Sequence, residues 1–289
     1  MKKTKKKGSG RGTVILVLIL IAGLSLLLYP TFSDWWNSFH QSQAIAAYVQ
    51  KVANMDREEY DRMLQEAEAY NRALLTKPNR YDLSDEEKEE YNAILDVTGT
   101  GIMGYIDIPS IKISLPVYHG TEESVLQTAI GHIEGTSFPV GGAGTHCAVS
   151  GHRGLPAARL FTDLDQLEKG DTFLIQVLDR TLTYEVDQIH TVLPEEMEDL
   201  EIDPQEDHFT LITCTPYGIN THRLLVRGKR IETLPEKPHV TADAIQLEPM
   251  FVAPLVAAPF LLLLLIILLA NTGKKRKQTG QQHGDETGE

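Results

Sequence analysis

The chain has 289 residues, and its 27 basic and 40 acidic side chains give a formal net charge of −13. Ten basic and three acidic residues lie in the end segments 1–12 and 271–289. Residues 13–270 therefore hold 17 basic (27 less 10) and 37 acidic (40 less 3) side chains, a net of −20. An acidic middle repels a polyphosphate backbone, which argues against nucleic-acid binding. Two cysteines exclude a disulfide framework and a four-cysteine zinc site.

Two apolar runs predict two membrane spans. Residues 13–29 are uncharged and follow a basic cluster, which predicts a retained anchor with a cytoplasmic N-terminus. The alternative is a cleaved signal peptide, but no small-x-small cleavage site follows the run. Residues 250–270 form the second run, and the basic residues 274–277 come soon after it. Both ends are therefore expected inside the cell, with the folded part outside.

The region between the spans changes character near residue 100. Before it, apolar residues recur at helical spacing, and Asp56 with Glu59 and Ser84 with Glu87 have the capping-box pattern. These signals predict helices at 35–53, 56–75 and 84–95. After it, short β-rich runs predict strands and a β-barrel or sandwich, with one short helix at 160–167. The predicted strands are 103–108, 115–118, 146–150, 172–178, 181–193, 209–215 and 222–231.

Cys214 ends one predicted strand, and Arg223 begins the next after the turn 216–221. Alternation places Leu211 and Thr213 on one face of the strand and Ile212 and Cys214 on the other. Hairpin pairing makes Cys214 and Arg223 neighbours at the rim of the sheet. A nearby guanidinium stabilises a thiolate nucleophile, and it can also donate hydrogen bonds to an oxyanion. The alternative is a buried structural cysteine beside a surface arginine.

A general acid or base is also needed for such chemistry. His152 lies between glycines where a strand gives way to a loop, which keeps its side chain accessible. Spacing does not exclude four other histidines, namely His119, His132, His146 and His222.

Three segments resemble the sortases, the membrane-anchored cysteine transpeptidases of Gram-positive bacteria. Residues 210–214 (TLITC) with Arg223 are similar to the family's TLxTC…R signature, and 150–154 (SGHRG) are similar to its catalytic histidine segment. Residues 101–120 resemble its opening strands. The string 213–223 (TCTPYGINTHR) and the second span resemble class C, the pilus-assembling branch.

The resemblance implies a mainly β fold, an eight-stranded sortase barrel with an N-terminal helical segment and two flanking transmembrane helices. It implies Cys214 as nucleophile, His152 as acid/base and Arg223 as the cation that stabilises the oxyanion or orients the substrate. The implied partners are proteins with an LPxTG-like sorting signal, cleaved between Thr and Gly, and an amine acceptor. That acceptor is a pilin lysine in class C and a peptidoglycan precursor in housekeeping sortases.

Many class C enzymes carry an Asp-Pro-aromatic lid before the barrel, but residues 77–82 read Lys-Pro-Asn-Arg-Tyr-Asp. The loop Lys77–Leu83 is therefore not expected to plug the site. Cys147 is expected to be a buried small residue, and a metal site or a disulfide with Cys214 is a weak alternative. The acidic run 195–201 is expected to be a solvated loop. No metal or cofactor is predicted.

The expected organisation has seven parts. They are a cytoplasmic basic tail (1–12), a transmembrane helix (13–29), an extracellular helical segment (30–99), a catalytic barrel (100–232), a linker (233–249), a second transmembrane helix (250–270) and a cytoplasmic tail (271–289). Membrane lipid is thus an expected partner. Two other functions remain open on these residues, a peptide-binding receptor or adhesin without catalysis and a plain cysteine peptidase.

Overall fold

The computed structural model describes residues 10–233, and its first element is one long helix, α1 (Gly10–Ala53). We expected a separate helix beginning near residue 35, but α1 continues from the apolar run without a break and contains Pro30. A proline deletes only one backbone N–H, and the 44-residue helix accommodates it. Within the described residues, this is the one helix long and apolar enough to cross a membrane. The second predicted span, 250–270, lies outside the described residues.

The end of α1 is attached to the barrel by a buried tyrosine. The hydroxyl of Tyr48 donates a hydrogen bond to the carbonyl of Met103 (3.0 Å) and accepts one from the N–H of Leu178 (2.7 Å). Burial raises the pKa of Tyr48 well above its usual range, so the hydroxyl stays protonated and neutral. Nearer the apolar run, the Asn37 side chain donates to the carbonyl of Ala157 at 2.8 Å. The helix is therefore tied to two separate parts of the barrel.

Two shorter helices precede the barrel, α2 (Arg57–Leu74) and α3 (Asp85–Ala93). Ser84 and Glu87 form the complete capping box that the sequence predicts. Asp56 makes only half of one, because its carboxylate accepts from the N–H of Glu59 without a reciprocal bond. α2 packs one face against the barrel. The buried residues on this face are Tyr60, Met63, Leu64, Ala67, Asn71 and Leu74.

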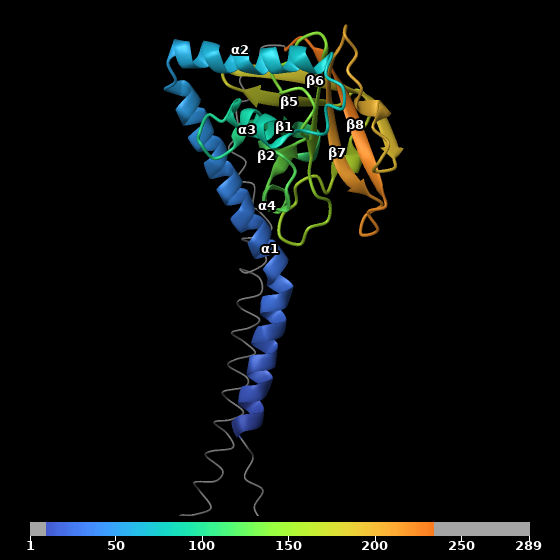
Figure 1. Cartoon of the computed structure of the whole chain (residues 1–289). Helices are drawn as coiled ribbons and strands as arrows, with labels where there is room; N and C mark the ends of the chain where they lie inside the picture. The colour runs from blue at the N-terminus through green and yellow to red at the C-terminus, as the bar shows by residue number, and fades with distance from the viewer. Residues whose placement is uncertain (1–9, 234–289) are drawn as a thin grey trace, which may run out of the picture. The chain divides into compact units, whose positions relative to one another are not determined.

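Eight strands close into a barrel in the order β1-β2-β3-β4-β7-β8-β6-β5, which confirms the expected fold (Figure 1). Seven of them match the predicted strands to within two residues at each end. The eighth, β3, has only three residues and gives no periodic signal, so the sequence did not reveal it. The strands are β1 (Ile102–Ile108), β2 (Ile113–His119), β3 (Ile130–His132), β4 (Thr145–Ser150), β5 (Thr172–Val177), β6 (Arg180–Val192), β7 (Asp207–Thr215) and β8 (His222–Ile231).

The connections between strands contain only short helices. A four-residue helix, α4 (Glu123–Leu126), precedes β3, and the 3-10 turns η1 (Pro109–Ile111) and η3 (Glu198–Leu200) follow β1 and β6. The helix predicted at 160–167 is wrong, because only the 3-10 turn η2 (Leu164–Gln166) forms there.

The barrel has its apolar core inside and a small second cluster outside. Leu211 packs in the main core, whereas Ile212 packs in the second cluster, with Ala148, Leu200 and Leu225. The alternation predicted along this strand is therefore confirmed. The second cluster lies under the connection from β6 to β7.

Two buried histidines tie loops to the barrel. His132 lies between the hydroxyl of Tyr91 (2.8 Å) and the carbonyl of Ser137 (2.9 Å). His146 lies between the carbonyl of Glu201 (2.9 Å) and the hydroxyl of Thr210 (2.7 Å). Burial lowers the pKa of His132 to about 3 and that of His146 to about 4. Both rings are therefore neutral at pH 7.

We expect acid to destabilise the fold over the pH range between the unfolded and folded pKa values of His132 and His146. A histidine with a lowered pKa contributes its full stability above the unfolded pKa, about 6.5, and loses it as the pH falls toward the folded value. Each ring should cost about 1.4 kcal/mol per pH unit below that point. The measurement is the free energy of unfolding of the full chain in detergent at pH 7, 6 and 5. His40→Gln, at an exposed position, should keep the wild-type pH dependence, and equal stability at pH 7 and 5 would contradict the prediction.

Candidate active site

The parallel pairing of β4 with β7 brings His152 next to Cys214. Every pair in this ladder joins residues 62 positions apart, from Thr145 with Asp207 to Ser150 with Ile212. Continuing the same register past the end of β4 places His152 opposite Cys214. The backbone supports this continuation, because the N–H of Gly151 donates to the carbonyl of Ile212 at 3.0 Å.

Side-chain bonds on either side of the pair hold the alignment. The hydroxyl of Thr213 donates to the carbonyl of Gly151 at 2.8 Å, before the pair. After it, Arg153 Nη1 lies 3.4 Å from the hydroxyl of Thr215. The neighbours of His152 are thus bonded to the neighbours of Cys214 on both sides.

The antiparallel pairing of β7 with β8 places Arg223 directly opposite Cys214. This is the adjacency that the hairpin pattern predicts. Within the described part of the chain, the guanidinium donates to two backbone carbonyls, those of Asn220 (3.3 Å) and His222 (3.1 Å). Among residues 17–233 it forms no ion pair, so its charge is available to a ligand. His152, Cys214 and Arg223 therefore form one row across three neighbouring strands.

The two cysteines occupy opposite environments, and both are free thiols. Cys214 is partly exposed at the end of β7. Cys147 is 2% exposed inside the barrel, as predicted, and burial together with Asp207 raises the pKa of its thiol well above the usual range. A buried neutral thiol is a poor nucleophile, which leaves Cys214 as the candidate.

Burial and bonding separate His152 from three of the other histidines. His119, His132 and His146 are buried, and both ring nitrogens of each are bonded within the protein. His152 keeps its ring accessible, and its Nε2 lies 3.6 Å from the carboxylate of Glu123 on α4. His222 begins β8 opposite Thr215, one place further from the row.

A groove of about 270 Å³ runs from Arg223 along the outside of the barrel. Its floor is the second apolar cluster. Its walls are Leu126 of α4 with Thr121 just before that helix, and the connection from β6 to β7. The apolar lining includes Leu126, Ile133, Val192, Leu200, Ile212 and Leu225. A groove with an apolar floor and a guanidinium in its lining suits an extended peptide whose carbonyl is to be polarised.

Sequence reasoning missed three residues of the site, Glu123, Arg153 and Tyr217. Arg153 forms an ion pair with Asp165, and its guanidinium lies 5.8 Å from the ring of Tyr217. Gly154 has φ +78°, and a Cβ there would lie 2.7 Å from the same ring. Gly154 was the sequence signal that pointed to this contact. Without a Cβ, it lets the backbone of the loop after β4 lie close to the ring of Tyr217.

The loop Lys77–Leu83 lies against the connection from β6 to β7. Its Arg80 donates to the carbonyl of Leu200, and a cavity between loop and connection is lined by Tyr81, Glu201 and Pro204. Within the described part of the chain, no hydrogen bond or ion pair of this loop reaches Cys214, His152 or Arg223.

Comparisons with known proteins identify a family for this chain. The family model described as "Sortase domain" matches residues 106–231. Sortase C1 from Streptococcus agalactiae is similar at 50% identity and a TM-score of 0.65, over 66% of this chain and all of that one. Sortase C from Streptococcus pneumoniae is similar at 45% identity and a TM-score of 0.61, over 67% of this chain and all of that one. Sortase A from Bacillus anthracis is 28% identical over 78% of this chain and 97% of that protein.

We expect an alkylating reagent to distinguish the two thiols. Iodoacetamide should modify Cys214 in the native chain and Cys147 only after unfolding, because reactivity follows exposure and thiolate character. Peptide mapping by mass spectrometry gives the site and rate. The Cys147→Ala chain should be labelled at the wild-type rate, and native labelling of Cys147 would exclude this assignment.

Proposed function

The chain belongs to the sortase family of cysteine transpeptidases, and on that basis we propose that it joins pilin subunits as a class C member. The similarity to two sortases named C, at 45% identity or more, supports the class. One solved relative at 44% identity is the sortase C1 of a pilus island. The structure of the S. pneumoniae sortase C is described in terms of pilin substrate specificity. The donor would be a protein with an LPxTG-like sorting signal.

The row His152–Cys214–Arg223 carries the proposal. In the first step the Cys214 thiolate attacks the carbonyl carbon of the motif's Thr, and the bond between Thr and Gly breaks. His152 gives a proton to the leaving glycine amine, and a thioester forms on Cys214. Arg223, opposite Cys214, donates hydrogen bonds to the oxyanion that develops on the same carbonyl.

In the second step an amine attacks the thioester. His152 accepts a proton from the attacking amine, the C–S bond breaks, and the donor is released as a new amide with Cys214 restored. For a pilus-assembling enzyme the amine is a pilin lysine. A peptidoglycan precursor amine and water are the competing acceptors.

The groove beside Arg223 is the proposed donor site. Its apolar floor can bury the leucine and proline of the motif, while Arg223 in its lining is paired with Cys214. The scissile carbonyl would then meet the thiolate and the guanidinium together.

The membrane arrangement is also part of the proposal. The apolar part of α1 fits a membrane anchor, and the basic residues before it favour a cytoplasmic N-terminus. With the second apolar run as another span, the barrel lies outside the cell and both termini inside. Donor and enzyme would then meet at the outer surface of the membrane.

We expect the acceptor to decide the product. The full chain should hydrolyse an LPxTG-type peptide slowly, and an added lysine-bearing pilin domain should turn most product into the amide. Mass spectrometry measures the product ratio as the acceptor concentration rises. Cys214→Ala should form neither product, while Cys147→Ala should form both. Hydrolysis alone, at every concentration of lysine-bearing and cross-bridge acceptors, would indicate a peptidase.

Arg223→Lys should be nearly as damaging as Arg223→Ala. Lysine keeps the charge but loses the planar fork that donates two hydrogen bonds at once. The loss of an oxyanion donor lowers the rate by about 10²–10³-fold. The measurement is kcat for donor cleavage, with Arg230→Lys, near the far end of β8, as the matched control. Wild-type turnover in Arg223→Lys would show that only a point charge is needed.

A further inference from the structure

One wall of the groove is the connection from β6 to β7, which contains η3. Leu200, the last residue of η3, is 3% exposed and packs with Ile212 and Leu225 on the groove floor. Met197 and Pro194 of the same connection also line the groove. The position of η3 therefore sets the width of the proposed donor site.

A buried arginine from outside the barrel holds this turn. Arg80 is 8% exposed, although it belongs to the loop before α3. Its Nη2 donates to the carbonyl of Leu200 (2.8 Å) and to the hydroxyl of Tyr81 (2.8 Å), and lies 3.7 Å from the carboxylate of Glu201. A buried guanidinium is costly unless it is bonded, so these contacts fix both the arginine and the turn.

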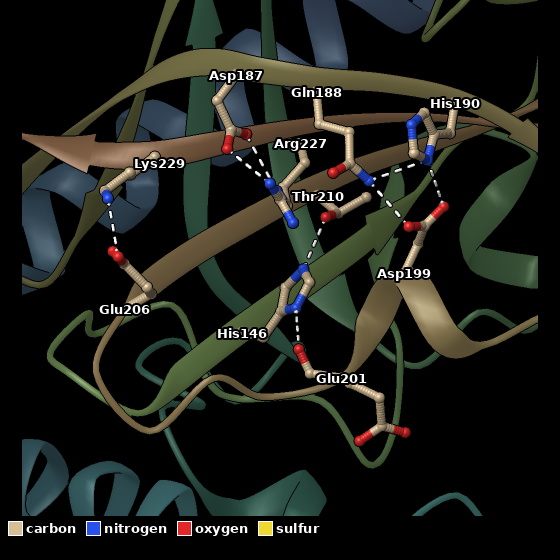
Figure 2. A network of polar contacts seen from close by, with 10 residues as sticks. All are labelled: His146, Asp187, Gln188, His190, Asp199, Glu201, Glu206, Thr210, Arg227 and Lys229. Atoms are coloured by element: carbon tan, nitrogen blue, oxygen red, sulfur yellow. Dashed lines mark hydrogen bonds and ion pairs between the residues drawn. The ribbon is translucent and has the colours of Figure 1, made fainter.

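The barrel holds the other side of the same turn (Figure 2). His146 on β4 bonds the backbone carbonyl of Glu201 at 2.9 Å. Gln188 and His190 on β6 each lie 2.9 Å from one carboxylate oxygen of Asp199. Arg80 thus adds a hydrogen bond to the carbonyl of Leu200 from the loop before α3, in addition to the contacts that the barrel makes with the turn.

We propose that Arg80 is a positioning residue for donor binding, which holds η3 so that Leu200 stays packed on the floor of the groove. This inference rests on the proposed function, because it assumes that the groove binds the sorting signal. The loop Lys77–Leu83 then braces the wall of the donor site rather than plugging the nucleophile. Loss of the brace should loosen the groove while leaving the row His152–Cys214–Arg223 in place.

The test uses Arg80→Met in the full chain, since methionine keeps much of the side-chain packing and removes every donor. The KM for an LPxTG-type donor should rise about tenfold while kcat stays within about twofold. The rate of Cys214 alkylation and the ratio of hydrolysis to amine transfer should not change. Arg80→Lys should restore most of the donor KM, because all three contacts are made by one nitrogen.

A matched control is Arg62→Met, which removes an exposed arginine of α2 that pairs with Glu66 at 3.2 Å. It should keep the wild-type KM. An Arg80→Met chain with the wild-type KM, or with a lower kcat at unchanged KM, would overturn the proposal. If Arg80→Met does not fold, Tyr81→Phe removes one partner of Arg80 without changing a charge, and it should raise the donor KM by a smaller factor.

Hydrogen exchange separates this inference from the proposed function. Backbone amides of residues 198–201 should exchange faster in Arg80→Met than in wild type, while those of β7 stay protected. If the wild-type chain cleaves no donor, the proposed function fails, and this measurement still decides whether Arg80 holds the turn. Unchanged exchange at 198–201 would refute the brace even in an active enzyme.

Discussion

The active-site geometry depends on the parallel pairing of β4 with β7. A constant offset of 62 residues along this ladder aligns a histidine and a cysteine that the sequence places far apart. Parallel neighbours need a long crossover, and here it contains β5 and β6. The hairpin of β7 and β8 then adds Arg223 on the other side of Cys214. Backbone pairing thus sets the register of the row, and side-chain bonds of Thr213 and Arg153 hold the alignment beyond the end of β4.

The same pairing explains why the two thiols differ. Cys147 faces into the barrel on β4, where burial keeps its thiol neutral, and Cys214 ends β7 at the rim. Water and substrate can reach the rim but not the core. A cation opposite Cys214 is placed to stabilise an oxyanion that develops on a carbonyl attacked there. Position along a strand therefore separates a structural cysteine from a candidate nucleophile.

The sequence predicted what depends on local pattern. Strand alternation placed Ile212 and Cys214 on one face, and the short turn between β7 and β8 made Arg223 the neighbour of Cys214. The three-residue β3 was too short for a periodic signal, and α1 continued through Pro30 where we expected a break. The bond from Arg80 to Leu200 joins residues 120 apart, and no local pattern encodes such a contact. Local signals thus predicted that Cys214 and Arg223 are neighbours, but not the bond from Arg80 that holds the wall of the groove.

The site has two kinds of support with different consequences. A strand ladder holds Cys214 opposite Arg223, and the β4–β7 ladder sets the register that leads to His152. A ladder cannot shift by one residue without breaking its neighbours' bonds. The wall of the groove is a loop, held by a few side-chain bonds from Arg80, His146 and His190. Contacts of that kind can change one at a time. A change in one of these contacts would therefore alter the wall of the groove and leave the pairing of Cys214 with Arg223 unchanged.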